Sequence, residues 1–315
     1  MRRAALALAL CSAALATGPS ASAFGTINEL GQHAEHERIT RWGLAEAGLG
    51  PATLDQLAGA TGTFGAVGAP DKPGRGLADV KAAHCDGGDY LPTPGYGQGE
   101  AEARAHLEAC RAWMFTNLDQ AVDDAAGMIQ ITPSSLALGC AFDGKRRGSA
   151  KCLVLEDLGL AFHVSQDFYA HTNWVDRPAP GAVGPDNPPG LGHAEPAPWI
   201  DPAHRDTAFP AGLISGCYDG FPEPLHCGAH GPNPRVAHRW LNKDEGVIDV
   251  AARTIAPGET TRGKVEGNFE RAVTAAVADT RGKWAWFAAQ LTARYGAARG
   301  AEMLCLLRSD DAAGC

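Results

Sequence analysis

One stretch constrains this chain more than any other: residues 158–176, LGLAFHVSQDFYAHTNWVD. Its apolar residues are spaced as in a helix that packs into a protein core, yet His163, Asp167 and His171 stand at every fourth position. Four residues of a helix advance by only about 40° around the axis, so these side chains share one stripe. Burying an uncompensated carboxylate costs several kcal/mol. The stripe therefore predicts bound cations.

Two interpretations of the stripe compete. Helix geometry separates His163 from His171 by about 12 Å along the axis, so one ion cannot contact both. We expect two ions with Asp167 between them, one carboxylate oxygen for each, as in dinuclear and trinuclear hydrolytic centres. In the alternative interpretation each histidine is an ordinary core or surface residue, which is the commoner case for a lone histidine. Three ligand-type residues on one stripe favour metal.

Two other segments supply residues of the same type. HAEHERIT places His36 at the start of a predicted helix, and AHCDGGDYLP places His84, Asp86 and Asp89 in a glycine-rich bend. Asp71 precedes them in GAPDKPG. Loops on a rigid scaffold often hold ligands. The alternative for Asp71 and Asp89 is a turn role beside glycine and proline.

The N-terminus has the pattern of a secretory signal peptide. Residues 1–23 contain a short basic start, an apolar run and the sequence ASA at 21–23. The apolar run is too short for a membrane span, and no later segment reaches about 20 apolar residues. We expect a secreted protein whose mature chain begins at Phe24.

Cysteine usage agrees with export. Eight cysteines follow the predicted leader, and an even count in an exported protein favours disulfides. Short separations suggest the pairs 140–152, 217–227 and 305–315, which leaves 85–110. A cysteine-rich zinc site is the weaker alternative, because the chain has no CxxC.

Hydrophobic periodicity predicts an all-α fold of the helical-bundle type. The predicted helices cover residues 33–48, 101–130, 153–175, 264–280 and 281–307. We expect one helical metal-binding domain over residues 24–315. Residues 66–100 are predicted to form an ordered loop. Residues 177–235 are rich in proline and glycine and are predicted to be a long, disulfide-tied loop or an insertion.

Charge and missing motifs exclude several functions. The formal net charge is −9 and no basic run occurs, which argues against long nucleic acid as a partner. The sequence has no GxSxG nucleophile elbow and no P-loop. With these classes of protein excluded, a metal site is the function that the sequence indicates most strongly.

In order and spacing, these residues resemble the zinc-dependent phospholipase C and S1/P1 nuclease superfamily, an all-helical fold with three zinc ions. The closer likeness is to the CinY proteins and the Het-C type module, through HVSQDFYAHTNWV and the LNKD segment at 241–244. The resemblance covers roughly residues 24–250. The zinc ligands it implies are Phe24 (through its main-chain amine and carbonyl), His36, Asp71, His84, His163, Asp167 and His171.

The chain departs from that superfamily at two points. The superfamily has five residues between the aspartate and the next histidine of the helix, whereas three separate Asp167 from His171. Its further HxxxE or HxxxD pair has no counterpart after His171, and we expect His238 with Asp244 to replace it. The alternatives to that pair are His230, His193 and Glu195. Two metal ions are therefore better supported than three.

The function expected from these features is a secreted, zinc-dependent phosphodiester hydrolase of the phospholipase C or nuclease type. Asp71 would be a ligand and general base. The expected substrate is a small phosphodiester or a phospholipid headgroup, and docking to a membrane surface stays open. The alternative is a non-catalytic exported module whose metal is structural and which acts in binding, immunity or assembly.

Overall fold

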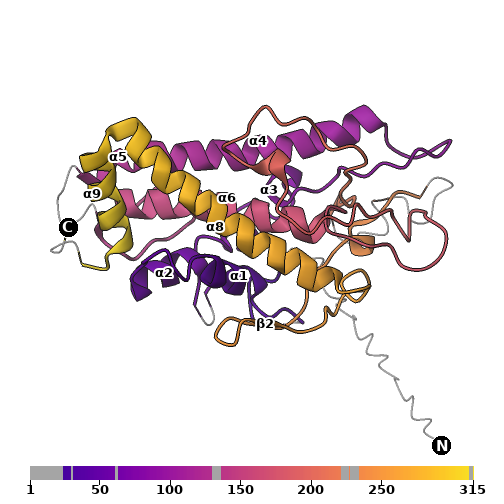
Figure 1. Cartoon of the computed structure of the whole chain (residues 1–315), viewed down its shortest axis with the longest axis horizontal. Helices are drawn as coiled ribbons and strands as arrows, with labels where there is room; N and C mark the ends of the chain where they lie inside the picture. The colour runs from indigo at the N-terminus through magenta and orange to yellow at the C-terminus, as the bar shows by residue number, and fades with distance from the viewer. Residues whose placement is uncertain are drawn as a thin grey trace, which may run out of the picture.

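One buried helix, α6 (Ala150–His171), forms the axis of the fold (Figure 1). All of its residues except Ala150 and Leu153 are buried. The computed structural model describes residues 24–29, 31–60, 63–129, 136–220, 227, 234–311 and 315. The predicted signal peptide lies outside these residues. Because α6 is covered on every side, its polar stripe lies within the core.

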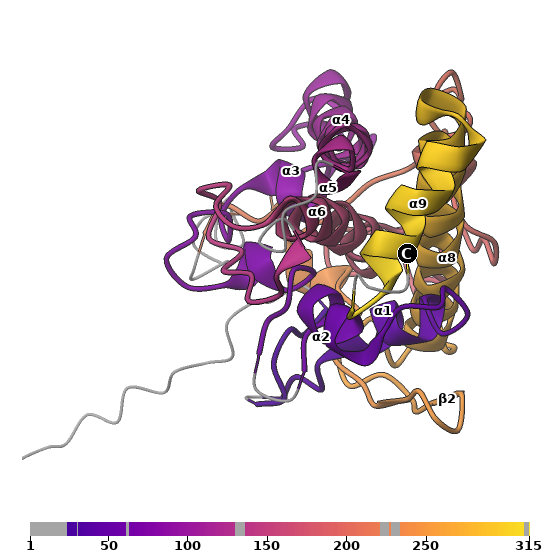
Figure 2. The same cartoon turned by 90° about the vertical axis from the view of Figure 1, so that its left-hand side faces the viewer.

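The other helices surround α6. Viewed along its axis, α4 lies above it, α8 and α9 lie on one side, and α1 and α2 lie below (Figure 2). The surrounding helices are α1 (Glu35–Gly43), α2 (Pro51–Ala58), α3 (Lys81–His84), α4 (Glu100–Asp124), α5 (Ala126–Ile129), α8 (Asn268–Tyr295) and α9 (Ala297–Arg308). The described chain is thus mostly helical, as the periodicity predicts. No helix in the described part of the chain is long and apolar enough to cross a membrane.

Local sequence explains where α6 begins and ends. The Ser149 hydroxyl accepts a hydrogen bond from the Cys152 backbone N–H at 3.0 Å, which caps the first turn. The helix stops at Thr172, whose backbone is extended and whose hydroxyl donates to the Phe168 carbonyl at 2.6 Å. His171 therefore occupies the last turn, where loops can reach it.

Short elements and loops complete the structure. These are the 3-10 turns η1 (Ala69–Asp71), η3 (Pro198–Ile200) and η4 (His238–Trp240), and the antiparallel strands β1 (Ile248–Asp249) and β2 (Thr254–Ile255). The described parts of the predicted loop 177–235 contain no α-helix, and they pack on the core. Trp199 is buried there, and Trp174 donates its indole N–H to the Glu195 carbonyl at 2.9 Å.

The predicted helix boundaries need two corrections. The tail was expected to break at residue 280, but α8 runs on to Tyr295 and the break falls at Gly296, which has a φ of 85°. Thr280 is buried against Gly43 of α1, so tertiary packing holds the helix through the expected break. Helix α2 was not predicted. It begins with Pro51 at its N-terminus, a position that suits proline.

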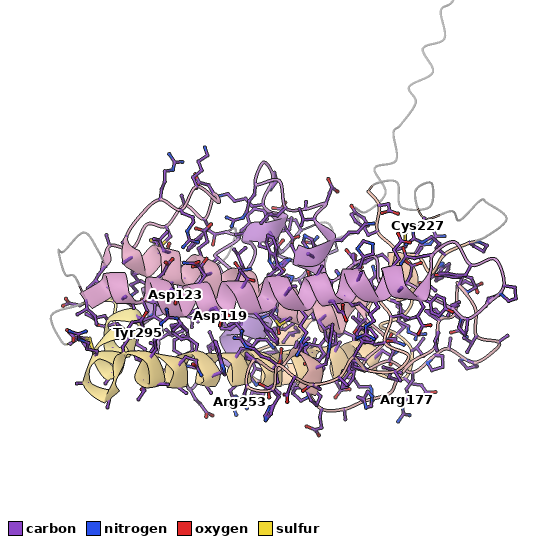
Figure 3. The ribbon with its side chains drawn as sticks, turned by 90° about the horizontal axis from the view of Figure 1, so that it is seen from above. Asp119, Asp123, Arg177, Cys227, Arg253 and Tyr295 are labelled. Atoms are coloured by element: carbon purple, nitrogen blue, oxygen red, sulfur yellow. A yellow bond between two sulfur atoms is a disulfide. The ribbon has the colours of Figure 1, made fainter. Side chains whose placement is uncertain are left out.

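The end of α8 returns to α4. Figure 3 shows Tyr295 beside Asp123, and the Tyr295 hydroxyl donates to the Val122 carbonyl at 3.0 Å. Arg294 forms an ion pair with Asp123. These contacts close the bundle at the end remote from His171.

All four predicted disulfides are present in the structure. Their members are Cys85 and Cys110, Cys140 and Cys152, Cys217 and Cys227, and Cys305 and Cys315. The bond from Cys85 ties the loop after α3 to α4, and the bond from Cys217 ties the loop that precedes His238. The predicted ligand His84 precedes the first of these loops and His238 follows the second, so both bonds lie beside predicted ligands in the chain.

Candidate metal centre

The side chain of Asp167 lies between histidines from three elements. Its Oδ2 atom is 3.0 Å from Nδ1 of His84 and 3.0 Å from Nε2 of His163, while Oδ1 is 3.1 Å from Nε2 of His36. The two ring nitrogens of His84 and His163 are 3.1 Å apart. Asp167, His36, His84 and His163, together with Asp71, are called the Asp167 cluster.

Asp71 forms the rim of this cluster. Its Oδ1 atom lies 3.8 Å from Nδ1 of His84 and 3.9 Å from Nε2 of His163. The Asp71 side chain is 16% exposed, whereas those of His163 and Asp167 are fully buried. Solvent can therefore reach the cluster at Asp71.

The ring nitrogens that point away from Asp167 are held by fixed groups. His36 Nδ1 lies 2.7 Å from the amide oxygen of Gln166, and His84 Nε2 lies 3.2 Å from the Leu77 carbonyl. Each of these oxygens accepts a hydrogen bond from the ring N–H. In the neutral tautomer this leaves a lone pair on the nitrogen that faces Asp167, which is the state in which histidine binds metal.

Several buried atoms of the cluster lack hydrogen bonds within the described part of the chain. They are Nε2 of His36, Oδ2 of Asp71, Nδ1 of His163 and Oδ1 of Asp167. A lone pair that faces a carboxylate oxygen at about 3 Å is unfavourable unless a proton or a cation lies between them. Two ligands of one tetrahedral zinc stand about 3.3 Å apart. The observed spacings and the nitrogen and oxygen donors therefore fit such an ion.

The pKa shifts of His84 and Asp167 show that positive charge stabilises the cluster. Burial opposes a charged His84 ring, but the hydrogen bond with Asp167 and the nearby carboxylates outweigh burial and raise the His84 pKa to about 9. Burial also opposes a charged Asp167, yet the surrounding imidazoles hold its pKa well below the ordinary value. The carboxylate stays ionised, and a proton or a metal ion must balance it.

A second group of ligand-type residues surrounds His171. Asp86 Oδ1 lies 3.2 Å from its Nδ1, and Asp244 Oδ1 lies 3.3 Å from its Nε2. His238 Nε2 is 3.7 Å from Asp244 Oδ2. All four residues are buried. This group, Asp86, His171, His238 and Asp244, is called the His171 cluster.

The His171 cluster repeats the features of the first. His171 Nδ1 donates to the His84 carbonyl oxygen at 2.7 Å, which frees Nε2 toward Asp244. The buried atoms without a hydrogen bond among the described residues are Oδ1 of Asp86, Nε2 of His171, Nδ1 of His238 and both carboxylate oxygens of Asp244. The predicted pair His238 and Asp244 thus lies beside His171.

Two expectations about site geometry differ from the structure. Asp167 was expected to lie between His163 and His171, but its second oxygen faces His36, because α1 packs against α6 at that level. Asp86 was noted in its loop without a ligand role, and it lies beside His171. Cys85 has a φ of 58°, so the chain reverses there and directs His84 and Asp86 to different clusters.

The other candidate residues have ordinary partners or positions. Asp89 forms an ion pair with Arg235 at 2.6 Å, and exposed His193 stacks on Trp174 with ring centroids 4.0 Å apart. His230 lies outside the described residues. Cys217 and Cys227, which lie near Asp219, are joined in a disulfide and are not free to bind metal.

Phe24 lies where the two clusters approach each other. Its ring is buried and meets the His36 ring edge-on, with centroids 5.9 Å apart. The next residue, Gly25, donates its N–H to the Asp244 carbonyl at 3.4 Å and accepts from the His36 N–H at 3.1 Å. The main chain at Phe24 is therefore near the Asp167 cluster, as its predicted ligand role requires.

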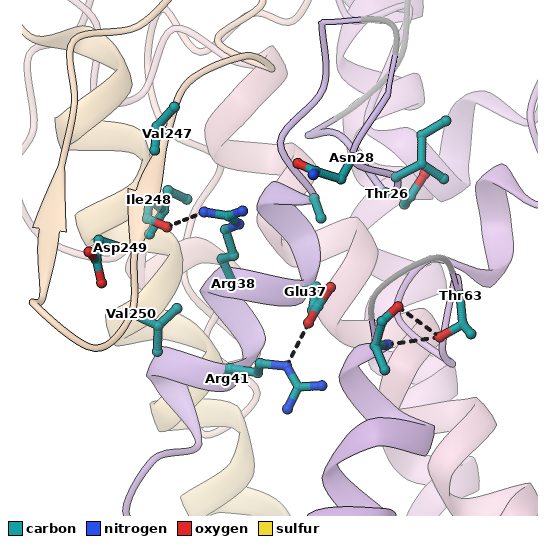
Figure 4. A pocket seen from close by; sticks show the side chains of 13 residues that line it. Thr26, Asn28, Glu37, Arg38, Arg41, Thr63, Val247, Ile248, Asp249 and Val250 are labelled. Carbon is teal, nitrogen blue, oxygen red and sulfur yellow. Dashed lines mark hydrogen bonds and ion pairs between the residues drawn. The ribbon is translucent and has the colours of Figure 1, made fainter.

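A surface pocket of about 350 Å³ lies on the outer face of α1 (Figure 4). Its arginines already have partners: Arg38 donates to the Ile248 carbonyl at 2.6 Å, and Arg41 donates to Glu37 at 2.8 Å. The pocket lining includes no residue of either cluster. His36, the one cluster residue on α1, is buried and does not line this pocket.

Comparison with known proteins gives no family for this chain. A scan against models of protein families finds no match, and searches of curated proteins and of solved structures find no significant match. The function is therefore argued from the geometry of the two clusters.

Proposed function

We propose that this protein is a zinc-dependent phosphodiester hydrolase related to the phospholipase C and S1/P1 nuclease type, and to CinY and Het-C proteins in particular. One observation carries the proposal. Both oxygens of buried Asp167 face imidazole nitrogens at 3.0–3.1 Å, while the far nitrogens of His36 and His84 are held by other acceptors. That arrangement suits a carboxylate shared between two ions.

Zinc is the best match among common ions. Imidazole with carboxylate is its usual donor set, whereas magnesium and calcium prefer oxygen alone. When bound, zinc supplies an acidified water and positive charge that stabilises a phosphoryl group in the transition state. We propose two ions at the Asp167 cluster and its Phe24 side. The sequence pattern favours two ions over three, but the buried, unsatisfied ligand atoms of the His171 cluster support a third ion there.

The residues of the chain have distinct roles in this proposal. His36, His84, His163 and Asp167 are too buried to meet substrate and act as ligands. Asp71, at the exposed rim, is the carboxylate that can both bind an ion and accept a proton from an attacking water. Its position makes it the proposed general base.

The proposed substrate is a small phosphodiester or the headgroup of a phospholipid. The net charge of −9 opposes a long polyanion. Four disulfides suit an oxidising compartment, which supports the proposal that residues 1–23 are removed as a leader during export.

Element analysis and a phosphodiesterase assay test the function together. Purified mature protein, which begins at Phe24, is analysed for zinc by mass spectrometry and assayed on bis(4-nitrophenyl) phosphate, with and without chelator. We expect bound zinc and chelator-sensitive hydrolysis. Asp71→Asn is expected to lower kcat at least 100-fold, whereas Asp79→Asn, an exposed aspartate of the same loop, is the matched control.

The alternative outcomes are distinct. Zinc without hydrolysis of phosphodiesters would support the non-catalytic exported module. Protein that was never exposed to chelator and holds no metal would contradict both functions.

A further inference from the structure

Gln166 is a fully buried amide of α6 that neither cluster includes. It precedes Asp167 in the chain, and its side chain reaches between α1 and α8. Its Oε1 atom lies 2.7 Å from Nδ1 of His36. Its Nε2 atom donates to the hydroxyls of Thr40 at 2.9 Å and Thr280 at 3.2 Å. One amide thus joins three helices around His36.

The structure orients the amide with its N–H groups toward the two threonine hydroxyls and its carbonyl oxygen toward His36. In this orientation the oxygen can only accept, so Nδ1 of His36 carries the proton. Its Nε2 then presents a lone pair toward Oδ1 of Asp167, 3.1 Å away.

We propose that Gln166 is a positioning residue that fixes the tautomer of His36 and so creates a metal-binding nitrogen in the Asp167 cluster. This inference rests on the proposed function, because it needs an ion at that cluster. Groups that orient a ligand histidine in this way typically change metal affinity 10- to 100-fold when they are removed. Gln166 touches neither substrate nor ion.

A reversed amide is the competing arrangement, and it predicts the opposite chemistry. If Gln166 donated to Nδ1, then Nε2 of His36 would carry the proton and bind Asp167 directly, with no lone pair for an ion. A carboxylate at position 166 can accept from Nδ1 and cannot donate to it when ionised. Gln166→Glu therefore separates the two arrangements, while Gln166→Met removes both kinds of hydrogen bond at similar volume.

The experiment measures how firmly the mature protein, which begins at Phe24, retains zinc. Wild type and variants, purified with their ions, are dialysed against increasing concentrations of a chelator, and zinc per chain is measured. Gln166→Met should release one ion at a chelator concentration 10- to 100-fold lower than wild type does. Gln166→Glu should stay within about threefold of wild type, since it keeps the acceptor.

Melting temperature and NMR distinguish a positioning role of Gln166 from a general effect on stability. Gln166→Met loses the threonine contacts, and Gln166→Glu buries a charge there, so both should melt at lower temperature. Only Gln166→Met should lose the ion early. Ser165→Ala is the matched control, because this neighbouring buried hydroxyl donates to Asp279 and does not contact His36. It should lower the melting temperature without changing zinc retention. Nitrogen-15 NMR should place the His36 proton on Nδ1.

The outcomes are distinguishable. Early ion loss in Gln166→Glu equal to that in Gln166→Met, or a His36 proton on Nε2, would overturn the role of Gln166. Wild-type retention in Gln166→Met would do the same. Absence of zinc from the wild type would instead overturn the proposed function.

Discussion

Asp167 is the residue on which the proposed centre depends, since it alone faces three histidines with both oxygens. Asp167→Asn keeps the shape but removes the charge and one acceptor. Zinc content and stability should fall together, because ligand binding energy is also folding energy. We expect a loss of at least about 3 kcal/mol, as for other broken buried charge sets.

The control for this variant is Asp119→Asn, which removes only a surface ion pair with Arg205. Zinc analysis and urea unfolding on both proteins provide the comparison. If Asp167→Asn kept its zinc and its stability, the shared-carboxylate geometry would be wrong.

The raised pKa of His84 predicts how stabilisation by zinc depends on pH. Its pKa rises from an ordinary 6.5 to about 9 in the folded metal-free protein. The proton on His84 therefore stabilises that protein fully below pH 6.5, and this contribution is lost as the pH rises through 9. Zinc competes with that proton. The rise in melting temperature on adding zinc should grow from pH 6 to pH 8.5.

A second titrating group acts in the same direction in this test. Burial raises the pKa of Glu35 to about 8, so its contribution also falls with increasing pH. The Asp244 carboxylate of the His171 cluster adds to that rise. Zinc at that cluster should lower the Glu35 pKa and so also increase the zinc-induced shift as the pH rises. A zinc-induced shift that shrank as the pH rose would contradict a ligand role for His84.

Sequence could predict some site residues and not others, for a physical reason. His163, Asp167 and His171 were predictable because one helix sets their spacing. Asp86 and Gln166 were not, because their roles depend on partners 85 and 130 residues away in the chain. Nothing in the local pattern distinguishes Gln166 from a solvent-exposed glutamine.

Among the elements, α6 was the most predictable, whereas α2 was missed and the break between the two tail helices was misplaced. An apolar run with helical spacing identifies a buried helix. The end of α8 was misplaced because the polar stretch ADTRGK resembles a helix end in sequence, whereas Asp279, Thr280 and Lys283 are buried on the face toward α1 and α6.

That buried face supplies a test at the level of helix packing. Lys283 lies 2.5 Å from Asp279 on α8, and the Ser165 hydroxyl of α6 donates to the same carboxylate. Lys283→Met leaves Asp279 buried without its cation, so it should cost about 3–5 kcal/mol. The double variant Lys283→Met with Asp279→Leu removes both charges and should be more stable than the single variant.

Urea unfolding of the single and double variants measures this coupling as a double-mutant cycle. Zinc content should not change in the double variant, since neither residue belongs to a cluster. A single variant as stable as wild type would show that the Lys283 charge contributes nothing to the contact between α6 and α8.

At the scale of the whole molecule, the two clusters join segments that are far apart in sequence. His84 ends α3 and Asp86 lies in the loop that follows, while His238 and Asp244 come after the long 177–235 loop. The disulfide pairing could be predicted because closure of short loops favours near neighbours. The meeting of these loops at the end of α6 could not, because it is a property of the packed bundle.

The disulfide between Cys85 and Cys110 lies next to residues of both clusters. Cys85 stands between His84 of the Asp167 cluster and Asp86 of the His171 cluster, and its bond to Cys110 anchors the tripeptide to α4. The double variant Cys85→Ser with Cys110→Ser should therefore weaken ion binding at both clusters. The variant Cys305→Ser with Cys315→Ser is the control, since that bond joins α9 to the last residue of the chain and neither cysteine is next to a cluster residue in sequence. Loop-closure entropy predicts a similar stability loss of about 3 kcal/mol for each. Equal zinc retention in the two variants would show that the bond contributes stability alone, and preferential loss in the first would show that it holds the ligands in place.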